Sequence, residues 1–125
     1  PKRYDTRFFI ALLSAAEAEV ASCDEHETVE HRWVHPRDAV DMAEAGTFFM
    51  APPTYLTLCE LADFDTGLEV MGAAGTRKVH PIMPKLDIAD GQWTVVLPGD
   101  PSYPATHPVE GPTQVAFREG RWSRS

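Results

Sequence analysis

The chain has 125 residues, of which 43% are hydrophobic and 24% charged, and these values fit one soluble globular domain. Its formal net charge of -8, with no basic cluster beyond the first residues, argues against nucleic acid as a partner. The longest apolar run, 8–13, is far shorter than the ~20 residues of a membrane-spanning helix, so we expect a cytoplasmic protein without a membrane partner.

The first third of the chain predicts two strands separated by a loop. Residues 4–14 (YDTRFFIALLS) are rich in aromatic and β-favouring side chains, and their nearly continuous apolar run predicts a strand covered on both faces. Helix propensity continues over 15–20, and the polar stretch 22–28 indicates a loop. A short strand is expected at 29–34, ending before Pro36 because a residue that precedes proline avoids the α region.

Three helices follow in the middle of the chain. A proline at the first helical position predicts a helix over 36–45, and Gly46 is a good stop for it. The apolar spacing over 53–63 predicts the most regular helix of the chain. A third helix, 66–75, begins at a threonine that forms a capping box with Glu69.

Beyond residue 78 the sequence favours β-hairpins and turns. Seven of the 11 prolines lie between 81 and 112. Asp90 and Gly91 stand between two apolar runs, 86–88 and 93–97, which is a strong hairpin signal. The stretch 98–112 indicates turns, and a last small hairpin is expected around Glu119 and Gly120.

Three consecutive blocks carry a resemblance to a known family. They are Tyr-Asp-Thr-Arg-Phe-Phe at 4–9, the acidic block Asp24-x-x-Glu27-x-x-Glu30-x-Arg32-Trp33-Val34 with Pro36 after it, and Pro52-Pro53-Thr54 followed by Leu56, Leu58 and Leu61. In this order and spacing they resemble the region after the catalytic helix of Nudix hydrolases, in the coenzyme A diphosphatase-like branch. The Leu-Pro-Gly-Asp-Pro run at 97–101 looks like a C-terminal extension of the bacterial members.

This resemblance implies a fold of the mixed α/β (α+β) class, with a Nudix-type mixed sheet between helices that is incomplete in this chain. Residues 1–78 would be the C-terminal part of a Nudix-like domain, and 79–125 a Pro-rich β-hairpin extension that packs on it. A missing N-terminal segment or a second copy is expected to complete the sheet, because the strand at 4–14 would otherwise have open edges. Nudix relatives are often dimers.

The resemblance also implies hydrolysis of a nucleoside diphosphate linked to another group, with coenzyme A-like compounds as candidate substrates and Mg²⁺ (or Mn²⁺) as cofactor. The family signature contains R-E-x-x-E-E, which places several metal-binding carboxylates on one helix face. This sequence lacks that motif. We therefore expect the main metal ligands upstream of Pro1 and an enzyme that is active only with that part. The alternatives are a catalytically inactive Nudix-like binding or assembly module, and an unrelated fold.

Four residues of this chain are candidates for the site. Glu27 and Glu30 are expected as auxiliary carboxylates, either as metal ligands or as a general base, although an acidic solvated loop would look the same. Arg7 could bind a substrate phosphate, form an internal salt bridge with Asp5 or Glu30, or reach solvent at the edge of the sheet. Tyr55 is expected to line the substrate cleft.

Other chemistries find little support in the sequence. The stretch 26–31 has one residue too many for an H-E-x-x-H zinc motif, and no G-x-S-x-G motif is present. Cys59 is expected as a buried small hydrophobe, and two unpaired cysteines favour a reducing compartment. The tryptophans are expected as core or hairpin anchors, namely Trp33, Trp93 and Trp122.

Overall fold

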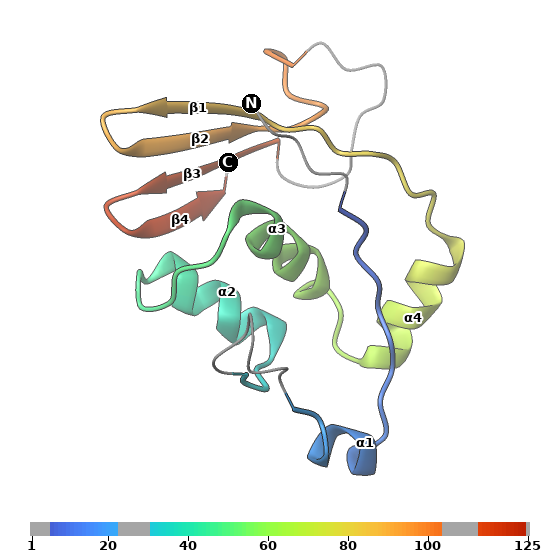
Figure 1. Cartoon of the computed structure of the whole chain (residues 1–125). Helices are drawn as coiled ribbons and strands as arrows, with labels where there is room; N and C mark the ends of the chain where they lie inside the picture. The colour runs from blue at the N-terminus through green and yellow to red at the C-terminus, as the bar shows by residue number, and fades with distance from the viewer. Residues whose placement is uncertain (1–5, 23–30, 104–112, 125) are drawn as a thin grey trace. The chain divides into compact units, whose positions relative to one another are not determined.

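The computed structural model describes residues 6–22, 31–103 and 113–124, and its helices and strands are labelled in Figure 1. They are α1 (Ala15–Glu19), α2 (Pro36–Glu44), α3 (Pro52–Leu61), α4 (Gly67–Thr76), β1 (Lys85–Ala89), β2 (Gln92–Val96), β3 (Gln114–Arg118) and β4 (Arg121–Arg124). This composition confirms the mixed α and β class. No helix in the described part of the chain has the length and apolar character needed to cross a membrane.

The chain divides into two compact units. Unit 1 contains 1–33 and 64–77, and unit 2 contains 34–63 and 78–125. Unit 2 therefore draws residues from both sides of the boundary predicted at 78/79. The division into a Nudix-like domain and an extension stays a prediction.

Unit 2 is built on a four-stranded sheet in the order β1-β2-β3-β4, in which each strand runs antiparallel to the next. Both predicted hairpins are confirmed. Asp90 and Gly91 join β1 to β2 with φ values of 53° and 75°, and Glu119 and Gly120 join β3 to β4 with 52° and 80°. Positive φ at both central residues matches the twist of the flanking strands, which explains why these dipeptides make tight hairpins.

One face of this sheet is apolar. Directly opposed residues on neighbouring strands point to the same side, and the pairings are Leu86 with Val95, Ile88 with Trp93, Val95 with Val115, Trp93 with Phe117, and Phe117 with Trp122. The opposite face carries polar or small side chains at most positions. The sheet can therefore bury one side only, and the helices of unit 2 pack there.

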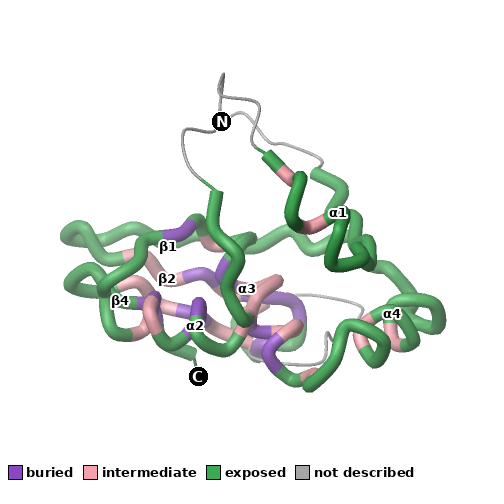
Figure 2. Tube along the Cα trace, turned by 90° about the horizontal axis from the view of Figure 1, so that it is seen from below, coloured by how far each residue is buried: buried purple, intermediate pink, exposed green. Residues whose placement is uncertain are grey.

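Helices α2 and α3 pack on each other, and α2 contacts β4. Figure 2 shows the buried residues of unit 2 along these two helices and the inner strands. The core consists of Ala39, Val40, Ala43, Met50, Tyr55, Cys59, Ala62, Val95, Leu97, Val115 and Trp122. Helix α2 begins at the predicted proline and is followed by Gly46 with φ of 76°. Cys59 is buried and free, as predicted.

Unit 1 has no buried side chain among its described residues, and α1 and α4 are exposed or half-buried throughout (Figure 2). Both helices begin with a capping box, at Ser14 with Glu17 and at Thr66 with Glu69. Their start sites are therefore fixed by local hydrogen bonds rather than by a core.

Three predictions in this region are wrong. Residues 6–14 form no strand and are exposed, with Phe9 90% exposed. Residues 31–34 form no strand either, and Trp33 is 64% exposed rather than an anchor. A strand needs a neighbour that takes its backbone hydrogen bonds, and the sheet of this chain is made from residues 85–124. β-Favouring composition alone therefore did not produce strands here.

Candidate functional site

The acidic loop of the predicted site lies outside the described residues. This applies to Asp24, Glu27 and Glu30 alike. Their role as auxiliary carboxylates stays a prediction.

Arg7 lies in the irregular segment before α1, and it is exposed. The sequence predicted a charged side chain inside an apolar strand, where it would need either a partner or access to solvent at the edge of the sheet. In the structure the guanidinium is accessible to water, so that requirement does not arise. An exposed arginine remains available for a phosphate oxygen. The phosphate-binding role of Arg7 stays a prediction.

Tyr55 is fully buried in unit 2 at the contact of α2, α3 and β4. Its ring stacks on Trp122, with 5.1 Å between the ring centroids and 15° between the planes. Its hydroxyl donates a hydrogen bond to Glu44 Oε1 at 2.8 Å. Arg124 Nε donates to the same oxygen at 3.2 Å. The hydroxyl and the ring of Tyr55 are therefore both occupied by contacts within unit 2.

The electrostatics of this polar cluster, Glu44, Tyr55, Cys59 and Arg124, suit a structural role. Burial raises the pKa of Tyr55, and its hydrogen bond to Glu44 raises it further. Burial also raises the pKa of the Cys59 thiol, which disfavours the nucleophilic thiolate. The Arg124–Glu44 pair is 41% and 34% exposed, so it adds little stability. Tyr55 is thus a neutral donor, and a substrate-lining role for it stays a prediction.

No local sequence pattern identifies the partners of Tyr55. Glu44 is 11 residues away, at the end of α2, and Arg124 is 80 residues from Glu44. Periodicity identified a helix around Tyr55, but it does not identify which distant charge meets the hydroxyl.

A second ordered carboxylate, Asp100, closes the turn after β2. It is buried and accepts hydrogen bonds from Ser102 N at 2.8 Å and Ser102 Oγ at 2.5 Å. These bonds lower the pKa of Asp100. Side-chain hydrogen bonds from Gln114 and Thr113 lower this pKa further, so Asp100 joins its own turn to the start of β3, which is a structural use of the Leu-Pro-Gly-Asp-Pro run.

The described residues do not fit the Mg²⁺ site that the resemblance implies. Within 6–22, 31–103 and 113–124, no three His, Cys, Asp or Glu side chains gather where they could hold a metal ion. Mg²⁺ sites in proteins need convergent oxygen ligands. No metal-assisted step is therefore assigned to these residues.

Known proteins support the resemblance that the three sequence blocks indicated. The acyl-coenzyme A diphosphatase NUDT19 of Gallus gallus is 25% identical over 122 residues, which cover 93% of this chain and 31% of the relative. The protein of the same name from Xenopus laevis is 28% identical, covering 91% of this chain and 30% of the relative. Nudix hydrolase 7 of Caenorhabditis elegans is 27% identical, covering 82% and 34%.

The chain spans about a third of the length of these curated relatives. No family model matches it, and no solved structure matches it. All three relatives are animal proteins, so they give no support to the bacterial type. What they do support is a relationship between this chain and the Nudix hydrolases.

Proposed function

We propose that this chain is the portion after the catalytic helix of a Nudix-type pyrophosphohydrolase. The observation that carries the proposal is the similarity to two acyl-coenzyme A diphosphatases over more than nine-tenths of the chain. On this proposal the substrate is a nucleoside diphosphate linked to another group, with coenzyme A-like compounds as the first candidates. Residues 1–78 would complete the Nudix-like domain, and 79–125 would be its extension.

The roles of this chain and of the rest of the protein in the reaction follow from the residues that are present. The sequence has no R-E-x-x-E-E motif, and its described residues have no metal-binding cluster. We therefore assign Mg²⁺ or Mn²⁺ binding to carboxylates elsewhere in the protein. Glu27 and Glu30 would assist them, and Arg7 would bind a phosphate of the substrate. The buried, free Cys59 is compatible with a reducing compartment such as the cytoplasm.

The first experiment compares hydrolysis of coenzyme A in the presence of Mg²⁺ by the 125-residue chain and by the complete product of its gene. We expect turnover only from the complete product. Turnover by the 125 residues alone would contradict the assignment of the metal ligands to other residues. Absence of turnover from both, over a panel of nucleoside diphosphate derivatives, would contradict the hydrolase proposal.

The second experiment tests the acidic loop within the complete product. Glu30→Gln keeps the size of the side chain but removes its charge, and Glu25→Gln makes the same change in the same stretch. If Glu30 acts as a general base, kcat should fall about 10²-fold or more in Glu30→Gln, while Glu25→Gln stays near wild type. Equal activity of the two variants would remove Glu30 from the mechanism.

An alternative function is a catalytically inactive Nudix-like module that binds a diphosphate or assembles with a partner. A degenerate R-E-x-x-E-E motif in the complete product of the gene would favour it, and an intact one would favour the enzyme. Titration calorimetry of the complete product with coenzyme A separates the two functions. Binding without turnover supports the module, whereas turnover with Mg²⁺ supports the enzyme.

A further inference from the structure

The outer strand of the sheet, β1, is open on one side. β1 pairs with β2, and in the described part of the chain no strand pairs with its other edge. All five residues of β1 are exposed, including Leu86 at 52% and Ile88 at 57%. At the other end of the sheet β4 packs against α2 (Figure 1). The apolar face is thus covered near β4 and about half exposed at Leu86 and Ile88 of β1.

The register of the first hairpin shows which backbone groups face the open edge. Opposed residues in antiparallel strands alternate between pairs that exchange both backbone hydrogen bonds and pairs that exchange none. The pair that flanks a two-residue turn, here Ala89 with Gln92, is of the bonded kind. Asp87 and Lys85 therefore bond to β2 as well. The N–H and C=O groups of Leu86 and Ile88 point to the open edge, beside their own exposed apolar side chains.

We propose that two copies of this chain associate through β1, with Leu86 opposite Leu86 of the second copy on a two-fold axis. In this antiparallel register the two leucines exchange backbone hydrogen bonds and pack side by side on the apolar face. Lys85 of each copy then faces Asp87 of the other on the polar face. The result is a continuous eight-stranded sheet. This inference goes beyond the proposed hydrolase function and does not depend on it.

Charge complementarity selects this register among the alternatives. Shifting the axis to Asp87 would place two carboxylates directly opposite each other, which is unfavourable. Shifting it to Ile88 would pair the two isoleucines but place Asp87 opposite Ala89 and Leu86 opposite Asp90, so the contact between unlike charges would be lost. The Leu86 register alone pairs unlike charges and like apolar side chains.

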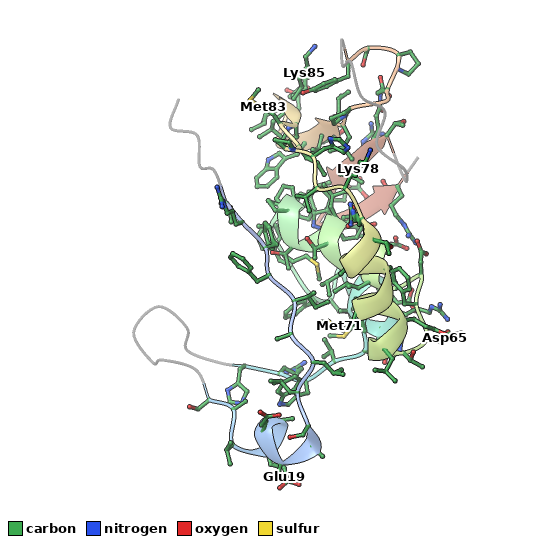
Figure 3. The ribbon with its side chains drawn as sticks, turned by 90° about the vertical axis from the view of Figure 1, so that its right-hand side faces the viewer. Glu19, Asp65, Met71, Lys78, Met83 and Lys85 are labelled. Atoms are coloured by element: carbon green, nitrogen blue, oxygen red, sulfur yellow. The ribbon has the colours of Figure 1, made fainter. Side chains whose placement is uncertain are left out.

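The two charged residues are available for this contact. Among the described residues, Lys85, labelled in Figure 3, makes a long hydrogen bond to Ser102 O at 3.4 Å, and its Nζ lies 5.3 Å from the ring centroid of Tyr103. Asp87 is exposed and has no hydrogen bond or ion pair to the described residues. Because the strand has only five residues and Pro84 cannot donate, the contact is small. We expect a Kd on the order of 0.1 mM, at the weak end of specific interfaces.

Sedimentation equilibrium of the 125-residue chain over a range of concentrations tests the proposal by charge exchange. Asp87→Lys sets Lys85 against a second lysine and should raise the dimer Kd about tenfold or more. The double variant Lys85→Asp/Asp87→Lys restores unlike pairs and should bring the Kd back to within about twofold of wild type. Asp41→Lys, an equal charge change on an exposed position of α2, is the matched control and should leave the Kd near wild type.

The outcomes separate clearly, with circular dichroism as the check that each variant is folded. A chain that stays monomeric up to about 1 mM, tenfold above the expected Kd, would overturn the proposal. Equal effects of Asp87→Lys and Asp41→Lys would overturn it too, because the response would then be one of net charge. Failure of the double variant to restore the dimer would overturn the register. Dissociation by Phe9→Glu, but not by Asp87→Lys, would assign the contact to unit 1 instead.

Discussion

The two units of this chain contain similar proportions of apolar residues but bury them very differently. Unit 2 has a closed core in which Val40, Val95, Val115 and Trp122 are at most 2% exposed. Unit 1 contains the longest apolar run of the chain, 8–13, yet none of its described residues is buried. Apolar composition thus did not decide burial. Unit 2 has an apolar sheet face and amphipathic helices that fit it, and the described part of unit 1 offers no such surface.

The two units are consequently stabilised by different kinds of hydrogen bond. In unit 1 the described hydrogen bonds are local, within capping boxes such as Thr66 with Glu69. In unit 2 the bonds join residues far apart in the sequence, such as Trp122 Nε1 to Met50 O at 3.0 Å. Local hydrogen bonds open independently of one another, whereas core contacts are lost together. Variants in matched pairs, one from each unit, can test this difference.

The largest difference is expected from removing an aromatic ring. Trp122→Ala deletes a 2% exposed side chain that stacks on Tyr55, and it should lower the free energy of unfolding by about 3–5 kcal/mol. Phe9→Ala deletes a 90% exposed ring in unit 1 and should change it by less than about 0.5 kcal/mol. Urea unfolding followed by circular dichroism measures both. A large effect of Phe9→Ala would show that the apolar run of unit 1 is buried in solution.

Replacing a glycine with alanine should lower stability in unit 2 and raise it in unit 1. Gly46 follows α2 with φ of 76°, and a Cβ there would lie 2.9 Å from Arg121 Cγ and 3.2 Å from Gly120 O. Gly46→Ala should therefore destabilise unit 2 by about 1–3 kcal/mol. Gly72 is inside α4 with open space around it, so Gly72→Ala should stabilise that helix by about 1 kcal/mol.

Amide hydrogen exchange resolves the two glycine effects by element. Protection in α4 should rise in Gly72→Ala, and protection in α2 and the sheet should fall in Gly46→Ala. If Gly72→Ala instead lowered protection in α4, that position would be in contact with another segment in solution.

The same contrast explains how far the sequence could predict the structure. Signals that act within a few residues succeeded, such as the proline that begins α2, the capping box at Thr66 and the hairpin dipeptide Asp90-Gly91. Residues 6–14 failed as a strand because a strand depends on a partner elsewhere in the chain or beyond it. The three sequence blocks also indicated the resemblance to Nudix hydrolases. Such a resemblance depends on the order and spacing of residues along the chain, and it requires no knowledge of contacts between distant residues.

The candidate site was less predictable for the same reason. Tyr55 was correctly placed on a helix, but its contact with Glu44 and Arg124 depends on how α2, α3 and β4 meet. That arrangement is set by packing, which no local pattern of residues records. Arg7 was predicted to need a partner or an exposed sheet edge because its segment was expected to be a strand, and that requirement disappeared with the strand.

Tyr55→Phe should have a smaller effect on the free energy of unfolding than Trp122→Ala. This variant removes the hydroxyl bonded to Glu44 and should lower the free energy of unfolding by about 1 kcal/mol at pH 7. Burial raises the folded-state pKa values of Tyr55 and Cys59 above their unfolded values of about 10 and 8.5. Their stabilising contribution is therefore complete below pH ~8.5 and is lost as the pH rises above these values.

Urea unfolding at a series of pH values between 7 and 11 checks this prediction, over a range set by the unfolded pKa values of about 8.5 and 10. The difference between wild type and Tyr55→Phe should shrink at the alkaline end, because only wild type can lose stability by ionising Tyr55. Phe9→Ala, from unit 1, should keep the wild-type profile. Parallel profiles for wild type and Tyr55→Phe would mean that Tyr55 is accessible to water.

The smallest effect on stability is expected from protonation of two carboxylates, one in each unit, that both accept hydrogen bonds from a nearby serine. Bonds from Ser102 lower the pKa of Asp100 in unit 2, and bonds from Ser14 lower the pKa of Glu17 in unit 1. Both stabilising contributions are present above the unfolded pKa values of about 3.9 and 4.3, and they are lost as the pH falls through the lower folded pKa values.

NMR titration of the amides should show α1 fraying as Glu17 is protonated, without any change in the sheet. Protonation of Asp100 should instead perturb Ser102 and the neighbouring end of β2. Glu17→Gln and Asp100→Asn should each remove only their own transition, whereas a single shared transition would show that the two units open together.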